Sequence, residues 1–262
     1  MKRGKPGVNR PNFSLDGRTA LVTGSSKGIG YAIAGGIAGA GARVVLNSRT
    51  KSTLDSAVGE LRSDGLPVEG ACFDITDAKA VIAAVDEIES RIGPIDILVN
   101  NAGVARRGKF DDMSLDDWSY VMDINVTGAF LVTKAIVPGM KRRRRGKIIN
   151  MCSLMSSIAR RDNTNYAASK GAIAMFTKAL AVELAADGIT ANGIAPGFID
   201  TPLTQPLVND TDFSEWLTTR APMGRWGKPE ELIGTAVFLA SEASGFITGQ
   251  IIYVDGGLTA VI

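Results

Sequence analysis

The chain has 262 residues, of which 45% are hydrophobic, and its formal net charge at pH 7 is only +2. This length and hydrophobicity suit one large α/β core, and the small net charge gives no sign of a nucleic-acid or membrane partner. The chain has no histidine, which excludes Ser-His-Asp and Cys-His nucleophile systems and every His-ligated zinc site. The two cysteines, Cys72 and Cys152, have no metal-ligand spacing, so we expect no metal site and a reducing, cytoplasmic compartment.

The N-terminal stretch MKRGKPGVNRPN is basic and rich in Gly and Pro, and no apolar run follows it. We therefore expect residues 1–12 to form a flexible tail rather than a signal peptide. Residues 13–262 would then form a single domain. No stretch reaches 18 uninterrupted apolar residues, so the sequence predicts no membrane span.

Short apolar, β-branched runs alternate along the chain with longer stretches of helical period. The runs predict strands at residues 19–23, 43–47, 68–74, 95–100, 147–153, 189–196 and 251–257. The longer stretches predict helices at residues 28–41, 51–64, 77–92, 114–141, 164–187 and 228–241. This alternation indicates a Rossmann-type α/β fold: a doubly wound parallel sheet in one domain, with helices on both faces.

The predicted helix at 28–41 contains Gly35, Gly36 and Gly39. Each glycine costs about 1 kcal/mol relative to alanine in a helix interior. We interpret these glycines as a sign that the helix packs closely on the sheet.

A glycine-rich turn joins the first predicted strand to the first predicted helix. Without Cβ atoms, the backbone of such a turn can approach a pyrophosphate, and the helix N-terminus offers free N–H groups. The turn consists of Gly24, Ser25, Ser26, Lys27, Gly28, Ile29 and Gly30, and we expect all seven residues to contact a dinucleotide.

The end of the second predicted strand bears on the choice of cofactor. NAD-preferring sites usually place an acid there to bind the ribose 2′-hydroxyl, whereas a nearby arginine accommodates a 2′-phosphate. This chain reads LNSRT, with no acid and with Arg49 just beyond the strand. Together with Lys27 in the turn, Arg49 favours NADP over NAD; alternatively, both side chains are simply solvated.

The stretch NYAASK places a tyrosine and a lysine four residues apart, on one face of a predicted helix. Such a pair occurs often by chance, so alone it is weak support for a catalytic centre. It gains weight from other motifs in a fixed order. These are TGSSKGIG at 23–30, NNAG at 100–103, DINVTG at 123–128, NMCS at 150–153, YAASK at 166–170 and PGFIDT at 196–201.

Jointly these motifs resemble those of the short-chain dehydrogenase/reductase family, from about residue 13 to the C-terminus. The resemblance implies a catalytic tetrad of Asn125, Ser153, Tyr166 and Lys170. It also implies that Tyr166 and Lys170 contact the cofactor. Further cofactor contacts are implied for Asp74, Ile75, Asn101, Gly103, Ile199 and Thr201.

Within that family the chain is most similar to the bacterial gluconate 5-dehydrogenases, also called 5-ketogluconate reductases. The stretches that carry this similarity include GPIDILVNNAGVARR, GKIINMCSLMS and PMGRWGKPEEL. The implied activity is NADP-dependent hydride transfer between gluconate and 5-ketogluconate. Reduction of a 3-oxoacyl group on a carrier protein is the alternative, and a non-catalytic nucleotide-binding regulator is a third reading.

The chemistry suits these residues. A secondary alcohol that loses hydride must also lose its hydroxyl proton, and a phenol becomes an adequate base near neutral pH only beside a positive charge. Lys170 supplies that charge one helical turn from Tyr166. Ser153 would donate a hydrogen bond to the substrate oxygen as charge develops there.

A sugar-acid substrate also needs a cation for its carboxylate, and planar guanidinium groups suit this role. The candidates are Arg106, Arg107, Arg160 and Arg161, among which the resemblance favours Arg107 and Arg160. Each is equally well read as a solvated loop arginine. In the family a segment matching residues 194–226 covers the substrate, and its side chains would determine specificity.

The most conspicuous charge cluster is KRRRR, residues 141–145. We interpret it as the solvated end of a helix, where cations complement the helix dipole. A docking patch for an acidic carrier protein is the main alternative. The family resemblance further implies a homotetramer assembled through the helices at 114–141 and 164–187.

Overall fold

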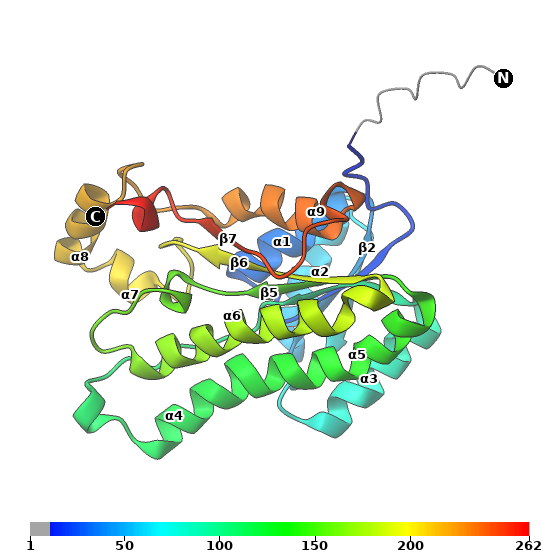
Figure 1. Ribbon diagram of the computed structural model, residues 1–262, viewed down its shortest axis with the longest axis horizontal. Coiled ribbons are helices and arrows are strands. Elements are labelled where there is room, and N and C mark those ends of the chain that lie inside the picture. Colours follow the sequence, from blue (N-terminus) through cyan, green and yellow to red (C-terminus); the bar gives the residue numbers. More distant parts are fainter. Residues whose placement is uncertain (1–10, 262) are drawn as a thin grey trace.

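The computed structural model describes residues 11–261, so most of the predicted tail at 1–12 lies outside the described residues. The sheet has seven strands, all paired in parallel, in the order β3-β2-β1-β4-β5-β6-β7. This arrangement confirms the predicted doubly wound Rossmann-type fold (Figure 1). The strands are β1 (Thr19–Val22), β2 (Arg43–Ser48), β3 (Val68–Cys72), β4 (Ile95–Asn100), β5 (Gly146–Met151), β6 (Ile189–Pro196) and β7 (Ile251–Val254).

Helices cover both faces of the sheet, as Figure 1 shows. On one face α1 (Gly28–Gly39) packs on β1 and β2, α2 (Lys51–Ser63) packs on β2 and β3, and α9 (Ile233–Ala240) packs on β5 and β6. On the other face α3 (Ala78–Arg91) contacts β3, α5 (Ala129–Arg143) packs on β4 and β5, and α6 (Thr164–Leu184) packs on β5 and β6. Strands β1 and β4 are almost fully buried, as expected when both faces of a parallel sheet are covered.

The glycines of α1 have a different partner from the one expected. A Cβ on Gly36 would clash with the Ile233 side chain, and one on Gly35 would come within 3.2 Å of Leu61. At Gly35 and Gly36 the helix thus packs closely on α2 and α9, while its other face packs on β1 and β2, and the interpretation of these glycines as sheet contacts is wrong. Gly39 is exposed, and a Cβ added there would meet no other atom within 4 Å.

The helix predicted at 114–141 is interrupted. It consists of α4 (Leu115–Met122), a π-helical turn at Asp123–Gly128, and α5. Taken together, these three helical parts, Leu115–Arg143, form the one segment among the described residues that is long and apolar enough to cross a membrane by length and composition. In the fold it packs against α3, α6 and the sheet.

The basic run at the end of α5 is largely engaged within the chain. Lys141 pairs with Asp187 at 3.2 Å, Arg143 donates to the Ile95 carbonyl at 2.8 Å, and Arg144 donates to the Ala186 carbonyl at 2.7 Å. Arg145 donates to Asp96 at 2.7 Å, and the Asp96 side chain is only 3% exposed. The run therefore lies at the largely exposed end of α5, as interpreted, and in addition it ties α5 to the sheet.

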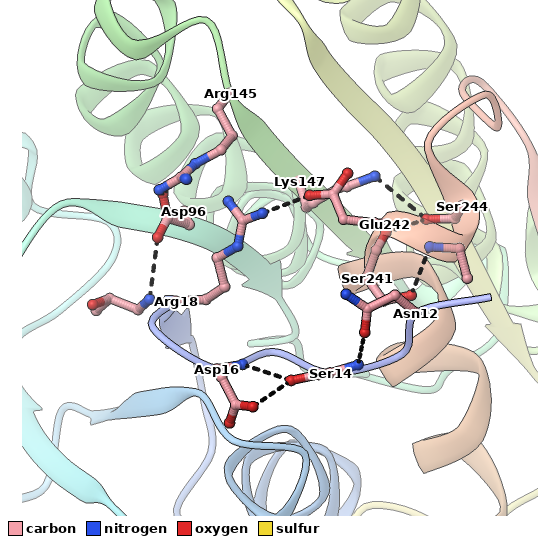
Figure 2. A network of polar contacts seen from close by, with 12 residues as sticks. Asn12, Ser14, Asp16, Arg18, Asp96, Arg145, Lys147, Ser241, Glu242 and Ser244 are labelled. Carbon is pink, nitrogen blue, oxygen red and sulfur yellow. Dashed lines mark hydrogen bonds and ion pairs between the residues drawn. The ribbon is translucent and has the colours of Figure 1, made fainter. Parts of the chain in front are cut away.

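The Arg145–Asp96 pair belongs to a set of polar contacts at the amino ends of β1, β4 and β5 (Figure 2). Asp96 also accepts a hydrogen bond from the Thr19 backbone N–H at 3.3 Å. Arg18, just before β1, reaches Glu242 after α9 at 2.5 Å. These contacts join the first described residues to the C-terminal third of the chain, at the end of the sheet opposite the glycine turn.

Candidate active site

A long cleft runs along the carboxyl ends of the central strands, where open α/β sheets generally bind ligands. It brings together residues that lie far apart in the sequence. Of the predicted site residues, the lining includes Gly24, Ser26, Lys27, Gly28, Ile29, Gly30, Arg49, Asp74, Ile75, Asn101, Gly103, Ser153, Tyr166, Lys170, Ile199 and Thr201.

The glycine turn forms a close backbone cradle between β1 and α1. Gly24 and Gly28 have φ angles of +60° and +59°, a region that favours glycine. A Cβ on Gly30 would lie 2.6 Å from the Gly24 carbonyl oxygen, so no larger residue fits there. Lys27, at the N-cap of α1, makes no side-chain capping bond, which leaves the first N–H groups of α1 available to a phosphate. The turn therefore fits a dinucleotide.

Ser25 does not face the cleft. Its side chain is fully buried; the hydroxyl donates to the Val22 carbonyl at 2.7 Å and accepts from the Asn47 N–H at 3.0 Å. The expectation that Ser25 contacts the cofactor is thus wrong, because its hydroxyl stabilises the turn itself.

The NNAG loop is hydrogen-bonded to the same turn. Asn101 donates from its side chain to the carbonyls of Thr23 and Gly24, both at 2.9 Å. The Thr23 hydroxyl in turn accepts the backbone N–H groups of Asn101 and Ala102. Asn101 thus fixes the distance between two walls of the cleft.

Asn47 lies next to the last residue of β2. Its side chain is buried, accepts from the Gly24 N–H at 3.2 Å and donates to the carbonyls of Ala71 and Phe73. The strand end therefore offers no carboxylate, and the exposed Arg49 follows at the rim of the cleft.

Asp74 and Ile75 line the same cleft near Arg49. Hydrogen bonds from the backbone N–H and hydroxyl of Thr76 hold the pKa of Asp74 below its usual range, so this acid stays charged. Ile75 is 7% exposed and packs against Gly128. A Cβ added to Gly128 would lie 2.5 Å from the Ile75 side chain.

Ser153, Tyr166 and Lys170 meet at the inner end of the cleft. Ser153 follows β5 and caps a short 3-10 turn, its hydroxyl accepting from the Met155 N–H at 3.2 Å. Tyr166 lies in the first turn of α6, and Lys170 lies one turn further on. The Lys170 Nζ donates to the Met151 carbonyl at 2.7 Å and lies 5.6 Å from the centre of the Tyr166 ring.

Asn125 stands behind these residues rather than in the cleft lining. It lies in the π-helical turn and is 2% exposed. Its Oδ1 accepts from the Val104 N–H at 2.8 Å, while its Nδ2 donates to the Val104 carbonyl at 3.0 Å and to the Ser169 hydroxyl at 2.9 Å. Asn125 therefore joins the loop after β4 to α6, beside Lys170.

Cys152 adjoins Ser153 but is no candidate nucleophile. Burial raises the pKa of its thiol, which outweighs the opposing effect of the nearby Lys170 charge. The thiol therefore stays protonated near neutral pH, and reactive cysteines are thiolates.

The four candidate arginines have different surroundings. Arg106 is engaged by Asp117 and lies over the Tyr120 ring, while Arg161 is exposed. Arg107 and Arg160 form no ion pair with any described residue. Their loops are joined by a hydrogen bond from the Gly108 N–H to the Asp162 carbonyl at 3.0 Å. Loss of hydration, together with the positive charge of Arg160, lowers the pKa of Arg107.

Several cleft residues were not identified from the sequence. Thr53 lies one turn into α2 beside Arg49, and Thr204 follows Thr201 in the segment after β6. The signal that could have identified Thr53 is its spacing: a polar residue four positions after Arg49, about one helical turn, can face the same cleft. The sequence offers no comparable signal for Thr204, whose hydroxyl bonds to the Ile199 carbonyl.

The fold and this cleft define a dinucleotide-binding protein of the Rossmann type. A family model described as enoyl-(acyl carrier protein) reductase matches residues 24–259. A gluconate 5-dehydrogenase of Gluconobacter oxydans is 49% identical over 94% of this chain and 96% of its own. The 5-keto-D-gluconate 5-reductase of Escherichia coli K12 is 45% identical over 95% of this chain and 98% of its own.

One solved structure is similarly close. A gluconate 5-dehydrogenase from Burkholderia cenocepacia, in complex with NADP and tartrate, superposes with a TM-score of 0.94 at 48% identity, over 96% of this chain and 99% of that one. The chain therefore belongs to the short-chain dehydrogenase/reductase family of NAD(P)-dependent oxidoreductases.

Proposed function

We propose that this chain is an NADP-dependent oxidoreductase that interconverts gluconate and 5-ketogluconate. The observation that carries the substrate class is the pair Arg107 and Arg160, two guanidinium groups that form no ion pair with residues 11–261. Neither belongs to the cleft lining, but Arg107 lies near both Arg160 and Tyr166. Unpaired arginines close to Tyr166 favour an anionic substrate, because guanidinium binds carboxylate with two parallel hydrogen bonds. The relatives named above act on sugar acids, which agrees with this assignment.

NADP is the proposed cofactor. The end of β2 carries Asn47 and Ser48 and no acid of the kind typical of NAD sites, and the Asn47 side chain is engaged by the backbone around it. Arg49, and Lys27 across the cleft, supply positive charge at the same end. Ser26, Gly28, Ile29 and Gly30 would contact the pyrophosphate, Asp74 and Ile75 the adenine, and Asn101, Gly103, Ile199 and Thr201 the remainder of the dinucleotide.

In this mechanism the bound cofactor supplies or accepts the hydride. Tyr166 takes the hydroxyl proton as the alcohol is oxidised and returns it to the ketone in the reverse direction. Lys170, held by the Met151 carbonyl, places a positive charge beside the phenol ring. Ser153 donates a hydrogen bond to the substrate oxygen where negative charge develops. Asn125 binds both the loop at Val104 and Ser169 of α6, and so fixes their relative position. We expect the proton to leave the site past Lys170, which follows Ser169.

A single spectrophotometric comparison tests this proposal. NADPH consumption is followed with 5-ketogluconate and, separately, with an acetoacetyl thioester. We expect turnover with the sugar acid and at most a trace with the thioester. The reverse result would assign the chain to 3-oxoacyl reduction, and no turnover with either substrate would favour a nucleotide-binding regulator. The engagement of the basic run within the fold already weakens its use as a docking patch for a carrier protein.

Arg107 provides the sharper test of substrate binding. Charge-assisted hydrogen bonds contribute about 1.5–3 kcal/mol, so Arg107→Ala should raise the KM for 5-ketogluconate roughly 10- to 150-fold. Arg106→Ala is the matched control, because Arg106 is already bound to Asp117 and its loss should leave KM nearly unchanged. Equal effects of the two substitutions would contradict the role of Arg107.

We also propose that residues 13–262 form one domain that assembles as a cytoplasmic homotetramer. Support comes from large apolar side chains exposed on α5 and α6: Phe130, Met175 and Val182 are 43%, 63% and 86% exposed. Such surfaces are usually covered by a partner. Sedimentation equilibrium would measure the mass in solution, and a monomer would contradict the assembly.

A further inference from the structure

Arg160 contacts the covering segment that follows β6. Its guanidinium carbon sits 4.5 Å from the centre of the Phe213 ring, a distance typical of a cation–π contact. Phe213 belongs to the first turn of α8 (Thr211–Arg220), within the covering segment, residues 194–226. Arg160 belongs to the loop that leads from Ser153 to Tyr166. The contact therefore joins the covering segment to the loop between Ser153 and Tyr166.

Phe213 is also central to an aromatic cluster formed by Phe198, Phe213, Trp216 and Trp226. Its ring centre lies 5.2 Å from those of Phe198 and Trp216 and 6.0 Å from that of Trp226. A hydrogen bond from the Trp226 indole N–H to the Ser214 hydroxyl, at 3.2 Å, adds to the cluster. Because Phe198 directly precedes the cleft residue Ile199, the position of Phe213 is set by parts of the chain that also shape the cleft.

A guanidinium group can use its face and its edge at the same time. The face stacks on an aromatic ring, while the N–H groups at the edge remain free for a carboxylate. Arg160 forms no hydrogen bond or ion pair through its guanidinium with residues 11–261, so its edge is available. Stacking also reduces the entropy that the long side chain would lose on binding an anion.

We propose that Phe213 is a positioning residue for the substrate carboxylate and acts through Arg160. This inference rests on the proposed function, in which Arg160 contacts that carboxylate. By holding the guanidinium plane against its ring, Phe213 directs the Arg160 edge toward the anion near Arg107. Specificity for an acid over a neutral ketone then depends on a residue that does not itself touch the substrate.

The test uses the complete chain with NADPH and compares 5-ketogluconate with the neutral ketone dihydroxyacetone. Phe213→Leu keeps an apolar side chain but removes the ring. We expect the KM for 5-ketogluconate to rise roughly 3- to 10-fold, with kcat within about twofold, as loss of one cation–π contact implies. The KM for dihydroxyacetone and the NADPH dissociation constant should not change. Phe213→Tyr, which keeps the ring, should restore the wild-type KM.

Trp216→Leu is the matched control. Trp216 belongs to the same aromatic cluster and is 48% exposed, but its ring does not lie beneath Arg160. A rise in KM with Trp216→Leu equal to that with Phe213→Leu would overturn the proposal, because it would indicate general loosening of the covering segment.

A double-mutant cycle separates this inference from the proposed function. In an Arg160→Ala background, Phe213→Leu should add no further rise in KM, since the two residues act as one unit. Additive effects would overturn the proposal. If Arg160→Ala raises KM but Phe213→Leu does not, the positioning role fails and the proposed function stands. If neither substitution affects KM, the contact between Arg160 and the carboxylate fails as well.

Discussion

Lys170 is almost fully buried, and its ammonium group is held by one backbone carbonyl, that of Met151. This arrangement fixes a positive charge beside the Tyr166 ring without a carboxylate that would neutralise it. A carboxylate in that place would remove the charge that favours the phenolate. In the proposed mechanism the buried lysine takes the place that a histidine system has in other enzymes, in a chain without histidine.

Tyr166→Phe tests this centre directly. The substitution removes the only group that we assign to proton transfer, so kcat should fall at least 100-fold, in line with the usual contribution of general acid–base catalysis. NADPH affinity, measured by fluorescence titration, should change by no more than about threefold. Tyr31→Phe is the control: the Tyr31 hydroxyl bonds to Glu60 on the surface, and its loss should leave kcat unchanged. Near-wild-type turnover by Tyr166→Phe would remove Tyr166 from the mechanism.

For individual residues, the sequence predicted which residues belong to the site better than it predicted the contacts that each one makes. The order and spacing of Ser153, Tyr166 and Lys170 identified three residues that the structure brings to one cleft. Ser25 was misassigned because a serine in a glycine turn can face a ligand or the strand beneath it. That choice depends on Asn47, 22 residues away, whose N–H the Ser25 hydroxyl accepts.

At the scale of elements, strands and helices with clear ends were predicted well. Strand β6 has the bounds expected, because Gly188, with φ of +73°, ends the preceding helical turn and Pro196, followed by Gly197, ends the strand. Helices α7 (Gln205–Val208) and α8 were missed within a proline-rich stretch. Their position depends on packing among aromatic rings that are far apart in the sequence, which local propensity does not report.

The glycines of α1 allow a matched test of helix packing. Gly36→Ala would place a methyl group against Ile233, and overpacking of this kind costs about 1–3 kcal/mol, more than the roughly 1 kcal/mol gained in helix propensity. Gly39→Ala meets no neighbour and should be neutral or stabilising by up to about 1 kcal/mol. Urea denaturation of the two variants measures the difference. Equal stabilities would show that α1 and α9 separate without cost.

At the scale of the whole molecule, polar contacts hold together segments that share no sheet pairing. Arg18 and Glu242 are 224 residues apart, and Figure 2 shows their contact close to the Arg145–Asp96 pair. Lys147 of β5 lies in the same region, with the Ser244 hydroxyl as its hydrogen-bond partner at 3.5 Å. Burial, with a further contribution from Arg18, lowers the pKa of Lys147, whereas the Glu242 charge opposes this change.

Lys147 should therefore destabilise the fold at neutral pH. Its folded-state pKa lies below the value of about 10.4 for an unfolded lysine, so between the two values the unfolded chain binds more protons and stability rises with pH. Lys147→Met keeps the length of the side chain and should raise Tm at pH 7. The advantage of the variant over the wild type should shrink as pH approaches about 10.4, the unfolded value. Thermal unfolding at a series of pH values measures it; a gap that is constant with pH would exclude Lys147 titration as its source.

The π-helical turn at Asp123–Gly128 has a consequence for the spacing of the whole chain. A π turn contains about one residue more than an α turn, and each residue of an α-helix rotates the next by roughly 100°. The extra residue thus sets the rotational phase between α4, which contacts α6, and α5, which packs on β4 and β5. Deleting one residue from 123–128 would turn α5 about its axis and withdraw Gly128 from Ile75. In the exposed turn at Asn209–Asp210, the same deletion should be far better tolerated. Length variation between homologous chains should therefore concentrate in the covering segment and avoid the π-helical turn.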